Sequence, residues 1–343
     1  MVAQIDRHYF ATRPLRLWSR LLAYGLFEGR PLTTRGRWIN PLIFAHCRLS
    51  ALMPQMKRVN APIFILGTGR SGTTILGVVL SMHRDIGFLN EPKALWHAAH
   101  GGEDLIGSYD RGEARYRLGG DDASVEVQRK MHHSFGLYLR LSGARRLLDK
   151  YPELIFRVPF VREIFPDARF LFLSRDGWDT CGSIGQWSQR LGTEVSGERH
   201  DWWGADRRKW RLLVEQIVPE HADLAPYAMT LDALDDQRAM AALEWIVSTR
   251  EGLRLASEDP TKVLHVPYED LCQDPELVAR QIETFASLPD DPVFRRYATE
   301  KLAAPRSHSQ FDLPHWLLRP FEQTQAARRA AAVVARGERR MRA

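Results

Sequence analysis

Short apolar runs alternate along this chain with longer segments in which apolar residues recur every three or four positions. The short runs are typical of strands buried on both faces of a parallel sheet, and the longer segments predict amphipathic helices. The predicted strands are Ile63–Leu66, Ile86–Leu89, Leu154–Val158, Arg169–Ser174 and Lys262–Val266. The predicted helices are Thr74–Met82, Val125–Leu139, Thr180–Gln189, Ala205–Val218, Ala239–Ser257 and Pro275–Phe285. This alternation predicts an α/β fold, a three-layer domain around a central, mostly parallel sheet.

The chain divides by composition into three parts. Residues 61–290 hold the predicted sheet and its helices, and residues 291–343 are expected to complete the ligand cleft and end in an Ala/Arg-rich helix. Residues 1–60 carry ten Lys and Arg against two acidic residues, a formal charge of +8 in a chain of net charge +6. This basic helical extension either packs on its own domain with its arginines in solvent, which we favour, or lies on an anionic membrane.

The composition also limits the cellular locations and the binding partners that are expected for this chain. Cys47, Cys181 and Cys272 are isolated thiols without C-x-x-C spacing, so neither a disulfide framework nor a zinc site is predicted. A reducing, cytoplasmic location fits best, with peripheral membrane contact through the basic extension as an option. No apolar run approaches the roughly 20 residues needed to span a bilayer, and no signal-peptide pattern is recognised at the N-terminus. No nucleic-acid-binding motif is recognised either, so a nucleic-acid partner is not expected.

The first predicted strand runs directly into a loop rich in Gly, Ser and Thr, which spans Gly67–Thr74 and leads into a helix. A buried strand, a turn with free backbone N–H groups and a helix N-terminus together form a phosphate site. Gly67 and Gly72 have the spacing of G-x-x-x-x-G-K-[S/T], but Thr73 stands where that motif has its Lys. The cation lies inside the loop instead, as Arg70. The loop therefore predicts a phosphate site that is not built for ATP, and a solvated loop charge is the alternative for Arg70.

A second anion site is predicted at the end of the strand Arg169–Ser174. Arg175 follows this strand, and Ser183 lies eight residues later, one or two turns into the next helix. The two side chains can converge on one phosphate, with Arg as a bidentate donor and Ser as a neutral donor. An Arg-Asp pair at a helix start is also common as a purely structural feature, so this site gains its weight from the loop at Gly67–Thr74.

These blocks together resemble the sulfotransferases that use 3′-phosphoadenosine-5′-phosphosulfate (PAPS), which are similar in fold to P-loop kinases. Gly69–Thr74 resembles their 5′-phosphosulfate loop, and Arg175 with Ser183 resembles their 3′-phosphate pair. Phe165–Phe170 and Val266–Glu276 resemble two further blocks of the family. The resemblance implies transfer of a sulfuryl group from PAPS to an acceptor hydroxyl without a metal. It implies that the donor is bound by Gly69, Arg70, Ser71, Gly72, Thr73, Thr74, Arg175, Ser183 and Tyr268, with Arg70 on the sulfuryl group and Tyr268 near the adenine.

The acceptor hydroxyl requires a general base, and Glu91 is the best candidate. It follows the second predicted strand, and Pro92 is expected to end that strand and fix the direction of Glu91. The Glu-Pro…Trp-His segment resembles carbohydrate-type sulfotransferases, in which this Glu is the proposed base. Alternatively Glu91 only pairs with a nearby cation, and His83 and His97 are other possible bases. Lys150 lies in a segment that resembles the family's E-K-T-P block, which implies a contact with the sulfuryl group or the acceptor.

The acceptor is expected to be a glycan, a glycolipid or a related metabolite. Trp202 and Trp203 suit sugar stacking and core packing equally, whereas a core position is favoured for Trp187, Trp210 and Trp245. Two other functions stay open. One is a P-loop kinase of small molecules, against which the missing Lys at position 73 argues. The other is a non-catalytic nucleotide-binding module.

Overall fold

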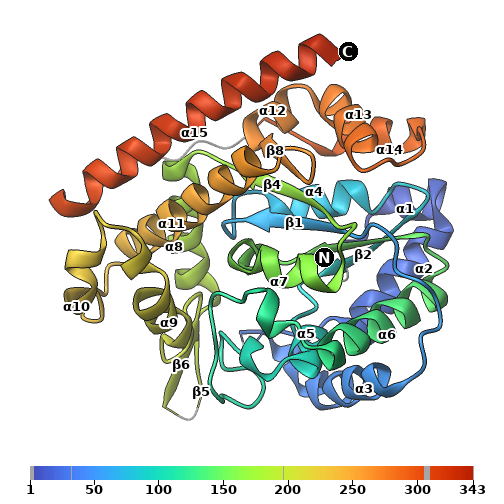
Figure 1. The fold of residues 1–343 in the computed structure, drawn as a ribbon, viewed down its shortest axis with the longest axis horizontal. Helices are drawn as coiled ribbons and strands as arrows, with labels where there is room; N and C mark the ends of the chain where they lie inside the picture. The colour runs from blue at the N-terminus through green and yellow to red at the C-terminus, as the bar shows by residue number, and fades with distance from the viewer. Residues whose placement is uncertain (1–3, 32, 196, 305–309, 343) are drawn as a thin grey trace.

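A five-stranded sheet forms the centre of the molecule, and helices cover both of its faces (Figure 1). The structure is a computed structural model that describes residues 4–31, 33–195, 197–304 and 310–342. Every neighbouring pair of strands in this sheet is parallel, which confirms the predicted α/β class. In spatial order the strands are β2 (Ile86–Asn90), β3 (Arg146–Lys150), β1 (Ile63–Gly67), β4 (Arg169–Ser174) and β8 (Val263–Pro267).

Helices, short helical turns and a small antiparallel sheet connect these strands. The α-helices are α1 (Arg7–Thr12), α2 (Pro14–Leu22), α3 (Asn40–Leu52), α4 (Thr73–Leu80), α5 (Lys93–Ala99), α6 (Val125–Ser142), α7 (Val158–Ile164), α8 (Gly177–Leu191), α9 (Arg208–Gln216), α10 (Ala228–Leu231), α11 (Gln237–Glu258), α12 (Tyr268–Gln273), α13 (Pro275–Phe285), α14 (Pro292–Lys301) and α15 (His315–Arg342). The short turns are η2 (Ala23–Phe27), η3 (Arg35–Ile39), η4 (Gly101–Glu103), η5 (Gly120–Asp122), η6 (Pro152–Arg157), η7 (Val218–Glu220) and η8 (Ala225–Tyr227). The antiparallel sheet consists of β5 (Thr193–Val195), β6 (Glu198–Asp201) and β7 (Gly204–Ala205).

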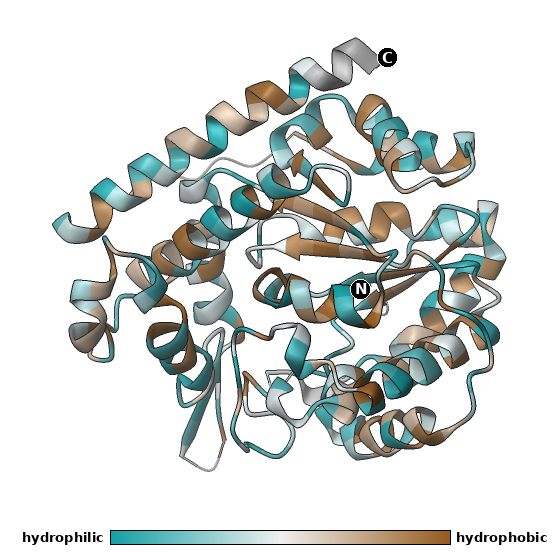
Figure 2. Ribbon diagram, in the orientation of Figure 1, coloured by the Kyte–Doolittle hydropathy of each residue, from teal (hydrophilic) through white to brown (hydrophobic). Residues whose placement is uncertain are grey.

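Each face of the central sheet is buried in its own core, because side chains alternate along a strand. In β1, Ile65 packs with side chains of α4, α13 and α14, whereas Phe64 packs on the opposite face with side chains of α11. Figure 2 shows the strands as largely hydrophobic, as burial on both faces requires. Helix α11 lies so close to β4 that a Cβ atom at Gly252 would be 2.1 Å from Cε2 of Phe172. The three predicted layers are therefore present.

One predicted strand is wrong. Leu154–Val158 forms η6 and the first residue of α7, and the third strand is Arg146–Lys150 instead. The apolar side chains of η6 are buried as those of a strand would be, and a short apolar run does not distinguish the two. In β3, by contrast, the buried residues include Asp149 and Lys150, so the strand does not read as apolar.

The N-terminal helices pack on the sheet beside its edge strand β2. Arg16 Nη1 donates to the carbonyl oxygen of Ile86 (2.8 Å), and Arg20 Nη1 donates to that of Phe88 (2.6 Å). Arg20 also forms an ion pair with Glu28 (2.7 Å), and both arginines are buried. The expectation that the arginines of this segment would lie in solvent is therefore wrong for these two.

The C-terminal helix α15 lies along α11 and α12 (Figure 1). Its Arg328 Nη1 donates to Glu269 Oε2 (3.0 Å), and its Gln325 Oε1 accepts from the backbone N–H of Gly177 (3.2 Å). These bonds fix the segment that follows β4. Within the described parts of the chain, no helix combines the length and the hydropathy needed to cross a bilayer.

Candidate active site

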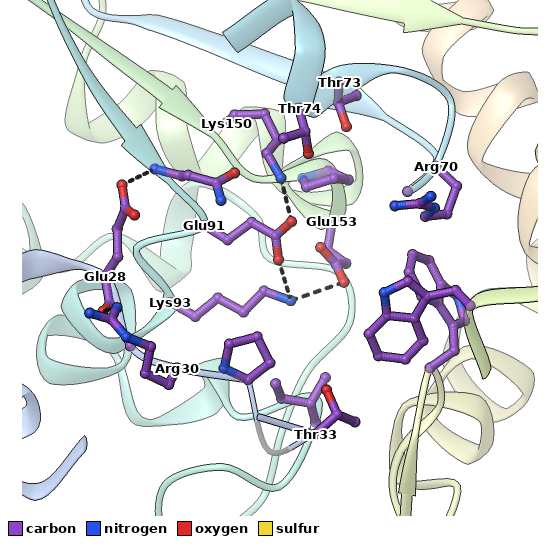
Figure 3. A pocket seen from close by; sticks show the side chains of 18 of the residues that line it. Glu28, Arg30, Thr33, Arg70, Thr73, Thr74, Glu91, Lys93, Lys150 and Glu153 are labelled. Atoms are coloured by element: carbon purple, nitrogen blue, oxygen red, sulfur yellow. Dashed lines mark hydrogen bonds and ion pairs between the residues drawn. The ribbon is translucent and has the colours of Figure 1, made fainter. Parts of the chain in front are cut away.

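A cleft of about 740 Å³ opens at the carboxyl ends of the strands. Gly69 and Arg70 follow β1, Glu91 follows β2, Lys150 is the last residue of β3 and Arg175 follows β4, and all of them line the cleft. This is the edge at which open parallel α/β sheets bind their ligands. Figure 3 shows the side chains of Arg70, Glu91 and Lys150 gathered around it.

The other walls of the cleft come from segments that are distant in sequence. Glu28 and Arg30 contribute from the N-terminal segment, where they lie opposite the loop after β1 (Figure 3). Trp187 of α8 and Trp202, between β6 and β7, contribute from the other side. The N-terminal segment is thus a structural part of the cleft.

The loop after β1 has a tightly turned backbone that depends on two glycines. Gly67 (φ +146°) and Gly72 (φ +106°) adopt conformations that L side chains rarely take. A Cβ atom at Gly67 would lie 2.4 Å from the carbonyl oxygen of Leu173, and one at Gly72 would lie 2.4 Å from the Tyr268 ring. Both positions therefore require glycine, and the loop that they shape leads directly into α4 at Thr73.

The two predicted anion sites adjoin each other in space. Arg70 Nε donates to Ser183 Oγ (3.2 Å), so the loop after β1 touches helix α8. The Arg175 guanidinium lies 4.8 Å from the centre of the Tyr268 ring, and it pairs with Asp179 (3.6 Å). Burial lowers the pKa of Arg70, and the positive charge of Arg175 lowers it further. Cations held this close together favour the binding of an anion between them.

Three other residues that are expected to bind PAPS, namely Ser71, Thr73 and Thr74, lie next to these cations. Ser71 is buried, and its Oγ donates to the carbonyl oxygen of Thr68 (2.6 Å), so this side chain shapes the loop itself. Thr74 lines the cleft together with Thr73 at the N-terminus of α4. The predicted donor residues are thus brought together, and their ligand contacts stay predictions.

Glu91 lies between two lysines, Lys93 and Lys150, that line the cleft with it. Its backbone is in the left-handed region (φ +55°), and its N–H donates to the carbonyl oxygen of Lys150 (2.8 Å). Lys150 Nζ donates to Glu91 Oε1, and Lys93 Nζ lies 3.5 Å from Glu91 Oε2. Burial raises the pKa of Glu91, but the charges of Lys150 and Lys93 lower it below its ordinary value. The carboxylate is therefore ionised at neutral pH and partly exposed to the cleft.

The ion pairs of Glu91 are the first in a series in which basic and acidic side chains alternate, from the cleft towards α11. Lys93 Nζ donates to Glu153 Oε1 (3.2 Å; Figure 3), and Lys209 Nζ lies 3.5 Å from the same oxygen. Lys209 also pairs with Glu244 (2.5 Å), which accepts a hydrogen bond from Trp202 Nε1 (2.7 Å). We call this series the charge chain: Lys150, Glu91, Lys93, Glu153, Lys209 and Glu244.

Four members of the charge chain were not predicted from the sequence. Lys93 and Glu153 are close in sequence to Glu91 and Lys150, which is the one local signal available. The other two are Lys209 in α9, which lines the cleft, and Glu244 in α11, which pairs with it, and only the fold brings these two residues together.

The other candidate bases lie away from the cleft. His83 is fully buried and its Nε2 is 2.9 Å from the carbonyl oxygen of Pro289. His97 stacks on Tyr109 with ring centres 4.6 Å apart. Neither histidine is among the described residues that line the cleft, so Glu91 is the candidate base that the geometry favours.

Some of the tryptophans lie in the core and others line the cleft, and one of them differs from the prediction. Trp203, Trp210 and Trp245 are buried in the core. Trp202 and Trp187 line the cleft with ring centres 5.4 Å apart and ring planes at 75°. The core position expected for Trp187 is therefore wrong, because the α8 face that carries it looks into the cleft.

The fold and the cleft define an α/β protein in which the glycine-rich loop after β1 and the carboxylate of Glu91 line one cleft. The model of the sulfotransferase family matches residues 62–292, and the chain belongs to this family. Protein-tyrosine sulfotransferase A of Caenorhabditis elegans is 28% identical over 131 residues, which are 37% of this chain and 33% of that protein. The protein-tyrosine sulfotransferase of Drosophila melanogaster is 32% identical over 126 residues, 36% of this chain and 24% of that protein. The match thus spans about a third or less of these relatives.

Solved sulfotransferases align with the chain at lower identity. Sulfotransferase STF9 from Mycobacterium avium aligns with a TM-score of 0.47 and 14% identity, over 95% of this chain and 86% of that one. The sulfotransferase domain from the curacin biosynthetic pathway aligns with a TM-score of 0.44 and 16% identity, over 78% of this chain and 98% of that one. As for metals, the described residues contain no group of three or more His, Cys, Asp or Glu placed to hold an ion.

Proposed function

We propose that this sulfotransferase moves a sulfuryl group from PAPS to a hydroxyl group of its acceptor. The observation that carries the proposal is that Glu91, Lys150 and Arg70 line one cleft together with Arg175 and Ser183. A carboxylate, cations for a transferring group and a phosphate-binding pair are the groups that such a transfer requires.

PAPS supplies the sulfuryl group when bound and leaves as 3′-phosphoadenosine-5′-phosphate (PAP). The cations around the loop, which repel one another, fit a donor with several negative charges. In this proposal Arg175 and Ser183 hold the 3′-phosphate, and Tyr268 lies near the adenine. The 5′-phosphosulfate is held by Gly69, Arg70, Ser71, Gly72, Thr73 and Thr74.

In this proposal, Glu91, Lys150 and Arg70 activate the acceptor hydroxyl and stabilise the sulfuryl group during transfer. Glu91 accepts the proton of the acceptor hydroxyl, since its lowered pKa keeps it ionised. Lys150 orients this carboxylate through their hydrogen bond. Arg70 and Lys150 also offer positive charge to the oxygens of the sulfuryl group, which is the role that fixed cations have in electrostatic catalysis.

Thermal-shift titration tests the donor. PAP is expected to stabilise the protein, by about 2.7 kcal/mol at a ligand concentration of 100 times the dissociation constant, whereas ATP–Mg²⁺ is not. Arg175→Ala is expected to weaken the PAP shift, and Arg140→Ala, an exposed arginine of α6, serves as the matched control. Stabilisation by ATP–Mg²⁺ alone would support a kinase instead. Binding of PAP with no sulfuryl transfer to any acceptor pool would support a non-catalytic module.

For the acceptor we propose a hydroxyl of a glycan, a glycolipid or a related metabolite. The support is the pair Trp187 and Trp202, whose rings line the cleft and can pack against the apolar face of a sugar. A tyrosyl hydroxyl is a second candidate, because the relatives named above are protein-tyrosine sulfotransferases. Parallel assays with labelled PAPS on glycans, glycolipids and tyrosine-containing peptides separate the two.

A further inference from the structure

Helix α2 carries large apolar side chains on the side that faces solvent. Leu15, Trp18 and Leu21 are 73%, 53% and 44% exposed. The buried side of the helix holds Arg16 and Arg20 together with Ser19 and Leu22. A helix of a water-soluble protein normally places its apolar residues on the core and its arginines outside. Here the two largest buried side chains are arginines, and the exposed side is apolar.

The same tendency continues through the rest of the N-terminal segment. Sixteen large apolar side chains of the described residues are exposed, and ten of them lie within the first 60 residues, about a sixth of the chain. Large apolar side chains concentrated in one exposed segment indicate an interaction surface in a folded protein. The ten are Phe10, Leu15, Trp18, Leu21, Leu26, Trp38, Leu42, Leu49, Leu52 and Met56.

The acidic side chains of this segment point into the protein, whereas several of its basic side chains are exposed. Its two acidic residues point inward, since Asp6 Oδ2 accepts from Lys301 Nζ (2.7 Å) and Glu28 pairs with Arg20 (2.7 Å). Basic side chains such as Arg7, Arg48 and Arg58 are exposed. The outward surface of residues 4–58 therefore combines leucine and tryptophan side chains with positive charge.

We propose that this surface docks on the headgroup region of an anionic lipid bilayer. Leucine, tryptophan and arginine on one surface are the composition of interfacial helices, which bury apolar side chains among the lipids while arginines bind anionic headgroups. A second copy of the chain fits less well, because two copies of a surface that carries exposed arginines such as Arg7, Arg48 and Arg58 would repel each other.

The same segment also reaches the cleft. Tyr24, Glu28 and Arg30 belong to it and line the cleft wall. A bilayer bound to the exposed side of this segment therefore contacts a part of the chain that also forms the cleft wall.

Co-sedimentation with vesicles tests the proposal without reference to activity. The protein is expected to bind phosphatidylcholine vesicles that contain phosphatidylglycerol, to bind pure phosphatidylcholine much less, and to lose most binding at high salt. Leu15→Glu/Leu49→Glu is expected to lower the partition coefficient by about tenfold or more. Met229→Glu/Val333→Glu, at exposed positions of α10 and α15 on the far side of the molecule, is the matched control and keeps full binding (Figure 1).

Two results would overturn the proposal. One is equal partitioning of both double variants, and the other is wild-type binding that does not depend on the anionic lipid. Self-association in sedimentation velocity that Leu15→Glu/Leu49→Glu abolishes would assign the surface to a second copy instead. Thermal melts of both double variants, with and without PAP, show separately that the fold and the donor site are intact.

Discussion

Lys93 is expected to stabilise the protein by holding two carboxylates of the charge chain. Its side chain is 13% exposed and that of its partner Glu153 is 10% exposed, so Lys93→Met leaves a nearly buried carboxylate with one cation fewer. Removing one partner of a buried ion pair costs about 3–5 kcal/mol. Lys209 stays 3.5 Å from Glu153, so we expect the lower end, about 3 kcal/mol. The more exposed Glu91 adds little to this loss.

This loss corresponds to a measurable change in the melting temperature. An unfolding entropy of about 2.1 cal/mol/K per residue gives about 0.7 kcal/mol/K for 343 residues, so 3 kcal/mol lowers the melting temperature by about 4 °C. The matched control is Lys130→Met on α6, because Lys130 forms a more exposed pair with Glu126 (2.8 Å). Loss of such a surface pair costs less than about 1 kcal/mol.

The effect of Lys93→Met is expected to depend on pH. Burial raises the pKa of Glu153, but the charges of Lys93 and Lys209 hold it well below its ordinary value of 4.5. The stabilisation by this carboxylate is therefore present above that value and is lost as the pH falls through the lowered pKa. Melts of wild type, Lys93→Met and Lys130→Met across acidic to neutral pH measure this. Equal melting temperatures of the two variants at neutral pH, or a difference that does not shrink in acid, would refute the reasoning.

Three further predictions follow from the cleft and the sheet. Glu91→Gln is expected to lower kcat by about 10² to 10⁴ while the PAP thermal shift is kept, and wild-type turnover would remove Glu91 as the base. Gly252→Ala places a Cβ 2.1 Å from the Phe172 ring and is expected to lower the free energy of unfolding by about 1–3 kcal/mol, with partial rescue by Phe172→Leu in denaturant titrations. Gly69→Ala meets Cη2 of Trp202 at 2.4 Å, so it is expected to weaken PAP binding unless Trp202→Ala accompanies it, as isothermal titration measures.

The convergence of the loop after β1 with Arg175 and Ser183 could be predicted from the sequence because each part lies in one short stretch of the chain. The loop after β1 lies in one continuous stretch. Arg175 and Ser183 are only eight residues apart, on either side of the position where a helix begins. The topology then brings these parts together, since the carboxyl ends of parallel strands share one edge. The contact between Arg70 and Ser183 is what that reasoning leads one to expect.

The rest of the site depends on long-range packing. Strand β3 does not show an apolar pattern because it contains the buried residues Asp149 and Lys150. Asp149 Oδ2 accepts a hydrogen bond from Trp96 Nε1 (2.8 Å), a partner 53 residues away in sequence. Lys209 and Glu244 face each other only because α9 and α11 meet beside the small antiparallel sheet (Figure 1). The pattern of apolar and polar residues along a sequence does not show which distant residues will pair in the folded protein.

Trp202 gives the protein an optical probe of the proposed donor site. Its ring lies against Gly69 of the loop after β1, its indole N–H is bonded to Glu244, and Lys209 Nζ lies 4.8 Å from its centre. Indole emission depends on nearby charge and on solvent access, so a ligand that displaces the loop after β1 or the Lys209–Glu244 pair is expected to change the fluorescence. Donor binding can then be followed in unlabelled protein, and the same titration in a Trp202→Phe variant isolates the signal of this one residue.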